Sequence, residues 1–231
     1  MLLAGALAMP ATAQDPPDRK APGVDKDAAV TIYRNGFASR AGYLEMRKHG
    51  AGECRRALNA RGMRIVVGRG NDRCMYRPPV NGLNVDMAVT ATLLRNTPGA
   101  LRPRTGVAVV LRSGRGGDYR FEVFPNRLSW QLTKLVPAAD GSEGERKVLA
   151  QGRDADAING TGARNRLRLR AFGSRLAGWI GDKLVVRHTD AEVSLAGRTP
   201  AVAVVGQGAV ASAAGLFDSI TVRARDPRGN G

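Results

Sequence analysis

The sequence predicts an all-β protein, folded as a jelly-roll sandwich of two antiparallel sheets. Apolar and polar residues alternate with a period of two in many short runs, and Gly, Pro, Asn and Ser residues end these runs. No stretch keeps the 3.6-residue period of a long helix. About a dozen short strands in a domain of roughly 200 residues are typical of two packed sheets. The chain, with 231 residues, is long enough to bury one sizeable core between them.

The alternating runs in the middle of the chain are separated by turns. They occupy residues 85–94, 107–111, 119–123 and 128–132. A glycine-rich segment at 113–117 separates the second run from the third, which indicates a hairpin. In the third run Tyr119, Phe121 and Val123 share one face. Glu122 lies on the opposite face, so we expect it to point away from the core and toward a groove.

The clearest alternation lies between residues 164 and 187. Three apolar residues point one way, namely Leu167, Leu169 and Ala171. A basic stripe points the other way, with ~6–7 Å between successive side chains, and consists of Arg166, Arg168 and Arg170. Turn residues at 173–174 and 181–182 divide this passage into three antiparallel strands, in which Trp179 lies opposite the apolar face. Runs at 202–205 and 216–222 add two further strands.

The N-terminal residues indicate export. Residues 2–9 are apolar apart from one glycine, which is too short a run to span a bilayer, and the segment 11–13 reads Ala-Thr-Ala, a small-x-small cleavage pattern. We therefore expect a signal peptide over 1–13, truncated because it lacks a basic start, and a disordered, proline-rich leader over 14–27. The folded domain is expected over 28–225, with a polar tail at 226–231. The predicted location is the periplasm, the medium or the cell surface, with no transmembrane span.

Export changes the interpretation of the two cysteines. In an oxidising compartment Cys54 and Cys74 are expected to form a disulfide, which closes a loop of about 20 residues. A catalytic cysteine is disfavoured, because His49 and His188 are the only histidines and neither brings an obvious third group.

The chain is strongly basic, with 36 Lys and Arg residues against 20 Asp and Glu residues, a formal charge of +16. One interpretation is an anionic partner, such as an anionic envelope polymer. The other is that arginines spread over the solvated faces of many strands, and their dispersion along the chain favours this second interpretation. No specific nucleic-acid binding is expected, because the chain has no known recognition motif and its aromatic residues are not interleaved with basic runs.

Three segments carry a resemblance to a known superfamily. They are TGVAVVLRSGRGGDYRFEVFPNRLSWQL at 105–132, NRLRLRAFGSRLAGWIGDKLVVRHTD at 165–190 and GLFDSITVRA at 215–224. Their order resembles the concanavalin A-like lectin/glucanase superfamily, which includes laminin-G-like and 3-keto-disaccharide-hydrolase-type domains. The resemblance implies a jelly roll over nearly the whole domain and a carbohydrate ligand. It does not fix an activity, because one fold hosts many functions.

The catalytic pattern of the related glucanases is missing. Those enzymes present Glu-x-Asp-x-x-Glu on one strand, and glycoside hydrolysis needs two carboxylates about 5–9 Å apart. No such string occurs here, and Glu122 or Asp86 would act alone. The resemblance also implies a structural calcium between the first and last strands, where Asp218 matches the closing acidic position. At the opening position this chain has Arg34 and Asn35 where an acid is expected, so the second anionic ligand is missing.

These observations predict an exported, non-catalytic binding module for a carbohydrate of the cell envelope. The candidate ligand-binding residues are Tyr119, Glu122, Trp179, Arg166, Arg168 and Arg170. Two alternatives stay open: a glycoside-acting enzyme with the same fold, and an envelope protein that binds polyanions through the arginine stripe. No cofactor is expected, apart from the alternative of a structural calcium at Asp218.

Overall fold

The computed structural model describes residues 29–37, 45–50, 52–114, 117–136, 144–191, 197–208 and 211–225. The predicted signal peptide (1–13), leader (14–27) and tail (226–231) lie outside the described residues. The described chain contains no helix, and therefore none of the length and apolar character that a membrane span requires.

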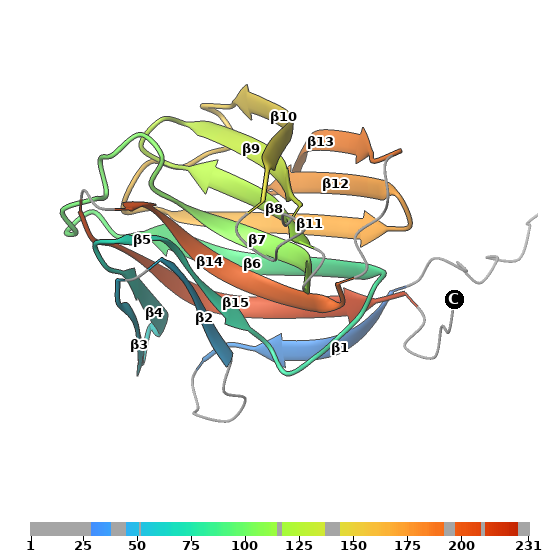
Figure 1. Ribbon diagram of the computed structural model, residues 1–231, viewed down its shortest axis with the longest axis horizontal. Coiled ribbons are helices and arrows are strands. Elements are labelled where there is room, and N and C mark those ends of the chain that lie inside the picture. The colour runs from blue at the N-terminus through green and yellow to red at the C-terminus, as the bar shows by residue number, and fades with distance from the viewer. Residues whose placement is uncertain are drawn as a thin grey trace, which may run out of the picture.

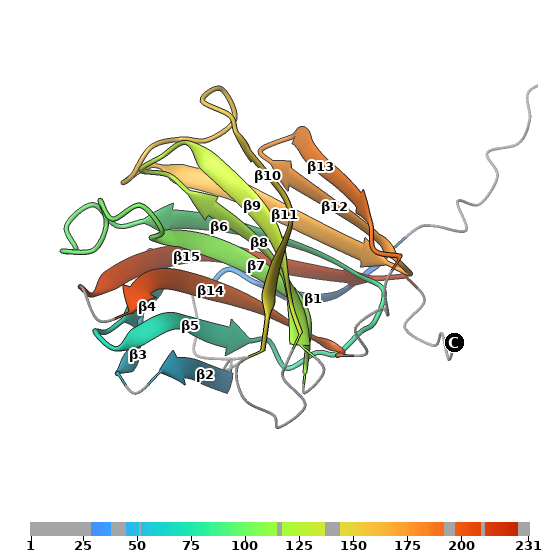
Figure 2. The ribbon, with the colours of Figure 1, turned by 45° about the horizontal axis from the view of Figure 1, so that its top comes forward.

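Two antiparallel sheets pack face to face, as predicted (Figure 1, Figure 2). The first has eight strands in the order β13 (Lys183–Thr189), β12 (Arg175–Ile180), β11 (Arg164–Phe172), β6 (Val85–Leu93), β15 (Ala213–Ala224), β4 (Gly62–Val67) and β3 (Cys54–Asn59), with β1 (Val30–Asn35) also paired to β15. The second has seven strands in the order β10 (Arg146–Arg153), β9 (Ser129–Leu135), β8 (Gly117–Phe124), β7 (Gly106–Gly114), β14 (Thr199–Gly208), β5 (Asn71–Arg77) and β2 (Glu45–Gly50).

The core lies between the two sheets and follows the predicted alternation. Phe121 and Leu132 from one sheet and Leu169 from the other are fully buried in one apolar cluster. Trp130 joins this cluster, with its ring centroid 6.1 Å from that of Phe121. Each such side chain contributes about 1.5–3 kcal/mol through the removal of apolar surface from water. The side chains at the alternate positions of the same strands point away from this core, where they can contact a ligand.

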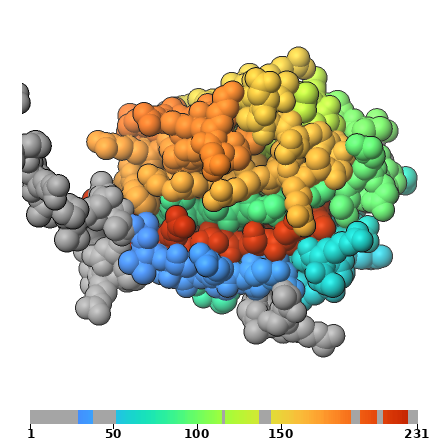
Figure 3. Space-filling model, turned by 180° about the vertical axis from the view of Figure 1, so that it is seen from behind, coloured from blue at the N-terminus to red at the C-terminus, as the bar shows by residue number. Residues whose placement is uncertain are grey.

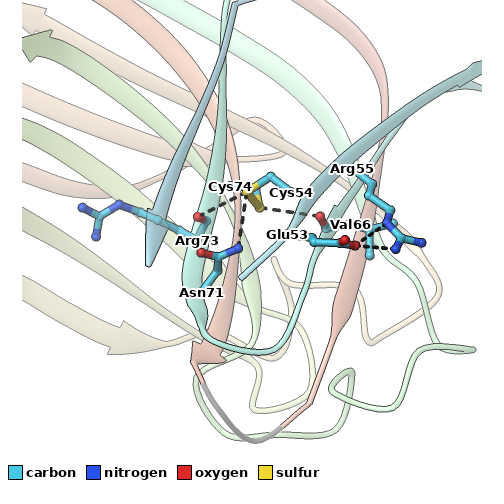
Figure 4. The surroundings of a disulfide bond; sticks show 7 residues. All are labelled: Glu53, Cys54, Arg55, Val66, Asn71, Arg73 and Cys74. Carbon is cyan, nitrogen blue, oxygen red and sulfur yellow. Dashed lines mark hydrogen bonds and ion pairs between the residues drawn. A yellow bond between two sulfur atoms is a disulfide. The ribbon is translucent and has the colours of Figure 1, made fainter. Parts of the chain in front are cut away.

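The predicted disulfide joins the two sheets at one end of the sandwich (Figure 4). Cys54 lies on β3 of the eight-stranded sheet and Cys74 on β5 of the seven-stranded sheet, with Cα atoms 5.7 Å apart. The amide Nδ2 of the buried Asn71 lies 3.8 Å from the Cys54 sulfur. The bond therefore fastens strands that backbone hydrogen bonds leave in separate sheets.

A buried ionic cluster joins the sheets at the side where β13 ends. Asp190 follows β13, and its carboxylate lies 2.7 Å from Lys134 Nζ of β9 and accepts a 2.5 Å hydrogen bond from the Tyr119 hydroxyl of β8. All three side chains are at most 4% exposed. Beside them, Arg112 of β7 donates to the carbonyl oxygens of Leu83 and Gly173 at 3.1 and 2.6 Å. Burial lowers the pKa of the Arg112 guanidinium, and the neighbouring Tyr119 and Asp190 oppose that shift.

This cluster makes Asp190→Asn strongly destabilising. The substitution leaves the Lys134 ammonium buried without its counter-ion, so we expect the free energy of unfolding to fall by about 3–5 kcal/mol in urea denaturation. Asp182→Asn is the matched control, because the side chain of Asp182 is 97% exposed beside Arg166 and its loss is expected to cost less than about 1 kcal/mol. Equal effects of the two variants would contradict the role assigned to the buried cluster.

Removal of the disulfide is expected to have a separate cost. The Cys54→Ala/Cys74→Ala variant frees a loop of 20 residues in the unfolded chain, so the free energy of unfolding is expected to fall by about 3 kcal/mol. Urea denaturation measures the loss, and mass spectrometry of the unreduced wild-type chain should contain the linked Cys54–Cys74 peptide. Rapid alkylation of both thiols in the native, unreduced chain would show that the bond does not form.

Candidate ligand-binding site

The sequence-predicted site residues fall in three separate places. Glu122 lies on the outer face of the seven-stranded sheet, as its alternation indicated. Trp179 and the stripe of Arg166, Arg168 and Arg170 lie on the outer face of the eight-stranded sheet, also as indicated. The structure corrects the expectation for Tyr119, whose side chain is 0% exposed and lies between the sheets. Tyr119 lies on the inward face of β8 as part of the buried ionic cluster, where its side chain is not accessible to a ligand.

Glu122 is fixed by two partners that come from neighbouring strands. Gln131 of β9 stands directly opposite Glu122 and donates a hydrogen bond from its amide Nε2 to the Glu122 oxygen Oε2. Arg146 of β10 reaches across to form an ion pair with the same oxygen. The Glu122 side chain is 1% exposed, whereas that of Arg146 is 36% exposed. The carboxylate is therefore held in one orientation with its charge balanced.

These residues line a hollow of about 730 Å³ on the outer face of the seven-stranded sheet. We call it the Glu122 hollow and define it by eight polar side chains: Asp72, Arg73, Arg104, Arg120, Glu122, Gln131, Arg146 and Gln151. A second hollow of about 500 Å³ shares Arg104, Gln131 and Gln151 with it and extends to one edge of the largely buried Trp130 on β9. Together they provide carboxylate, amide and guanidinium groups beside one aromatic edge, the polar set that orients a small ligand in a pocket.

The positions around Glu122 carry no second carboxylate. Its neighbours on the same face are Arg120 and Phe124 along β8, Gln131 on β9 and Ala108 on β7. Asp118, four residues away on the same strand and so about 13 Å distant, is held by Arg120, whose Nε lies 2.5 Å from its Oδ1. Among the described residues that line the hollow, Asp72 is the only other acid, and it follows the first residue of β5 on the far side of the sheet. Among the described residues, the strand positions next to Glu122 therefore hold no partner for the close carboxylate pair that glycoside hydrolysis needs.

On the outer face of the eight-stranded sheet, two of the remaining predicted residues, Arg168 and Arg170, bind Asp86, whereas Arg166 lies 3.3 Å from Asp182. The Asp86 carboxylate is 3% exposed and receives Arg168 through both of its oxygens, with Nε 2.7 Å from Oδ1. Arg170 Nη2 lies 3.1 Å from Asp86 Oδ2. The guanidinium groups of Arg168 and Arg170 stack over Trp179, 4.6 and 5.3 Å from the ring centroid. The hydrogen bond to Asp86 raises the pKa of Arg168. Two arginines therefore bind the carboxylate of Asp86, which the enzyme alternative considers, like Glu122, as a lone catalytic acid.

Asp218, the predicted calcium ligand, lies on β15 beside an arginine. Its side chain is 15% exposed, and Arg164 Nε lies 2.6 Å from its Oδ2. Within the described ranges no three His, Cys, Asp or Glu side chains come together as a metal site. A calcium at Asp218 stays a prediction, and it would have to displace the guanidinium of Arg164.

No known family model matches the chain, and no curated protein matches it. Several solved structures match the chain. The carbohydrate-binding module CBM66 from Bacillus subtilis matches with a TM-score of 0.57 and 16% identity, over 79% of this chain and 97% of that one. The catalytic domain of an endo-1,3-β-glucanase (laminarinase) from Thermotoga petrophila matches with a TM-score of 0.60 and 8% identity, over 85% and 98%. The κ-carrageenase from Pseudoalteromonas carrageenovora matches with a TM-score of 0.60 and 5% identity, over 91% and 99%.

The fold is a jelly-roll sandwich, shared with these solved structures. This confirms the architecture that the three sequence segments implied. At these identities the likeness shows the fold alone, and the matched structures include both a binding module and enzymes. The side chains of this chain must therefore decide between binding and cleavage.

The link between Glu122 and Arg146 is testable by a double-mutant cycle. Because Glu122 is buried, we expect the Glu122→Gln/Arg146→Met cycle to give a coupling energy of about 1.5–3 kcal/mol in urea denaturation. The matched pair is Glu53 and Arg55, whose side chains are 69% and 73% exposed. A Glu53→Gln/Arg55→Met cycle should couple by less than about 1 kcal/mol. A coupling no larger for the first pair than for the second would contradict the geometry of the hollow.

Proposed function

We propose that this protein is an exported binding module that holds a carbohydrate in the Glu122 hollow and does not cleave it. The observation that carries the proposal is a carboxylate fixed at the bottom of a polar hollow, with an amide, guanidinium groups and no second acid on the neighbouring positions. Each part of this arrangement favours recognition of sugar hydroxyl groups.

The polar groups of the hollow match the hydrogen-bonding needs of a sugar. A sugar hydroxyl both donates and accepts, so it can donate to Glu122 and accept from Arg146 or from the amide of Gln151. Glu122 is already held by Gln131 and Arg146, so little side-chain entropy is lost when the ligand binds. The edge of Trp130 in the adjoining hollow offers an apolar surface at the end of the same cleft.

The same residues argue against hydrolysis. A glycosidase needs an acid and a second carboxylate about 5–9 Å from it. Here the positions nearest Glu122 hold Arg120, Phe124, Gln131 and Ala108. The enzymes that share this fold therefore support a glycan ligand more than they support a reaction.

Export is part of the proposal. The apolar segment and cleavage pattern within residues 1–13 favour secretion. The Cys54–Cys74 disulfide supports an oxidising compartment, since such bonds are rare in the cytosol. The ligand is then a glycan of the envelope or of the surroundings of the cell.

A glycan array identifies the ligand, and calorimetry with the best neutral oligosaccharide tests the site. We expect Arg146→Ala and Gln151→Ala each to weaken binding by about tenfold or more, because each removes a hydrogen-bonding group from the hollow. The control is Lys147→Ala, an exposed basic residue on the same strand that does not line the hollow. Binding should change little with salt, because the ligand is uncharged.

Two results would count against this function. Equal losses in the Lys147→Ala and Arg146→Ala variants would remove the hollow as the binding site. A rise in reducing ends when the bound oligosaccharide is incubated with the wild-type chain, absent in Glu122→Gln, would show an enzyme instead of a binding module.

A further inference from the structure

A second hollow lies on the opposite side of the molecule, on the outer face of the eight-stranded sheet. It has a volume of about 190 Å³ and runs over β6 and β15, between β11 and β1. Figure 3 shows this face, with β6 in green and β15 in red sunk between the orange strands and blue β1. We call it the arginine groove and define it by its lining residues: Arg34, Asp86, Ala88, Val89, Thr90, Arg166, Arg168, Ser219, Thr221 and Arg223.

The walls of the arginine groove are cationic. Four arginines line it against one aspartate, which leaves a charge of +3. They come from three strands, with Arg34 on β1, Arg223 on β15 and the other two on β11. Arg34, Arg166 and Arg223 are exposed. The one acid, Asp86, is buried beneath Arg168 and Arg170, so it positions guanidinium groups and presents little negative charge to a ligand.

Part of this cationic wall is held rigid. Arg168 is fixed from below by both oxygens of Asp86 and from the side by the ring of Trp179, which stands opposite it on β12. A free arginine side chain loses up to about 2 kcal/mol of rotamer entropy on binding, and an arginine already held in place loses less. The stripe that looked like an ordinary polar strand face in the sequence is therefore partly preorganised.

The floor of the groove is built from small side chains with hydroxyl groups. Thr90 on β6 and Ser219 and Thr221 on β15 provide them, and Ser219 Oγ lies 3.3 Å from Thr90 Oγ1. No aromatic ring lines the groove among the described residues, so it has no platform on which nucleic-acid bases would stack. Hydroxyl groups below and guanidinium groups on both sides suit a sugar chain that carries acidic groups.

We propose that the arginine groove binds a linear polysaccharide bearing carboxylate or sulfate groups. Guanidinium groups bind both kinds of anion through paired hydrogen bonds. The groove runs parallel to β6 and β15, which favours a ligand chain laid along it over a single small ion. This site lies on the other sheet from the Glu122 hollow, so it adds a second ligand to the proposed function and does not depend on it.

Binding of the purified full chain to four probes tests the proposal at increasing salt concentration. The probes are polygalacturonate for carboxylates, dextran sulfate for sulfates, unmodified dextran as the neutral control, and a short DNA duplex. We expect at least one acidic polysaccharide to bind more tightly than dextran, and its affinity to fall by about tenfold or more between 50 and 200 mM salt. The acidic polysaccharide that binds identifies the acid.

A matched pair of variants locates the binding. Arg34→Gln/Arg223→Gln removes two exposed arginines from the groove, and we expect it to weaken polysaccharide binding by about tenfold or more. Arg61→Gln/Arg69→Gln removes the same charge from exposed turns outside the groove and should change the affinity by less than about threefold. Arg146→Ala should leave this binding unchanged, whereas it weakens binding of a neutral glycan, so the two proposals fail separately.

Three results would overturn the proposal. The first is no binding of either acidic polysaccharide at 150 mM salt. The second is an equal loss in the two double variants, which would assign the binding to net charge alone. The third is tighter, groove-dependent binding of the DNA duplex, which would make the ligand a nucleic acid.

Discussion

The buried carboxylate of Asp190 links the two sheets, and the two outer faces depend on how these sheets are held together. Asp190 follows β13 of one sheet, and its carboxylate binds Lys134 and Tyr119 of the other, all buried. Arg112 crosses in the opposite direction, from β7 to two carbonyl oxygens of the eight-stranded sheet's loops. Buried charges are costly unless each has a partner, so this end of the sandwich tolerates no change of a single member. The disulfide joins β3, at the edge of one sheet, to β5 of the other by a covalent bond.

With the sheets fixed, the two outer faces acquire different chemistry. On the seven-stranded sheet, the carboxylate of Glu122 forms an ion pair with Arg146 and accepts a hydrogen bond from Gln131, in a polar hollow suited to neutral sugars. On the eight-stranded sheet, one buried acid, Asp86, organises arginines beside a groove with a cationic rim. Strand pairing places arginines of β1, β11 and β15, which are dispersed in the sequence, on one face. Part of the formal charge of +16 is therefore concentrated on that face.

Alternation in the sequence was sufficient to predict β6 to β9 and β11 to β15 and the direction of their side chains. It predicted the outward stripe of β11 and the outward Glu122. It missed the edge strand β10, whose residues are mostly exposed or half-buried, because an edge strand needs no regular apolar face. The strands β1 to β5, between residues 30 and 77, were also missed. β3 alternates only between exposed and half-buried residues, whereas most residues of β4 and β5 are buried.

The sites were harder to predict than the strands, because their contacts join distant residues. Asp86 and Arg168 meet across 82 residues through the pairing of β6 with β11, and Arg146 reaches Glu122 across 24. Tyr119 was misassigned as a ligand contact although alternation placed it on the face of Phe121 and Val123, which is the buried face. Arg112 turns inward because its φ of 54° breaks the alternation of β7, and no sequence pattern signals a positive φ at an arginine.

The central claim is that a neutral glycan binds in the hollow around Glu122. The most direct measurement is the mapping of backbone amide chemical shifts by NMR as the oligosaccharide selected by the array is added. We expect the largest shifts at Glu122, Gln131 and Gln151, with the amides of Arg166 and Thr221 on the opposite sheet unmoved. Shifts centred on β11 and β15, with β8 to β10 unaffected, would contradict the claim.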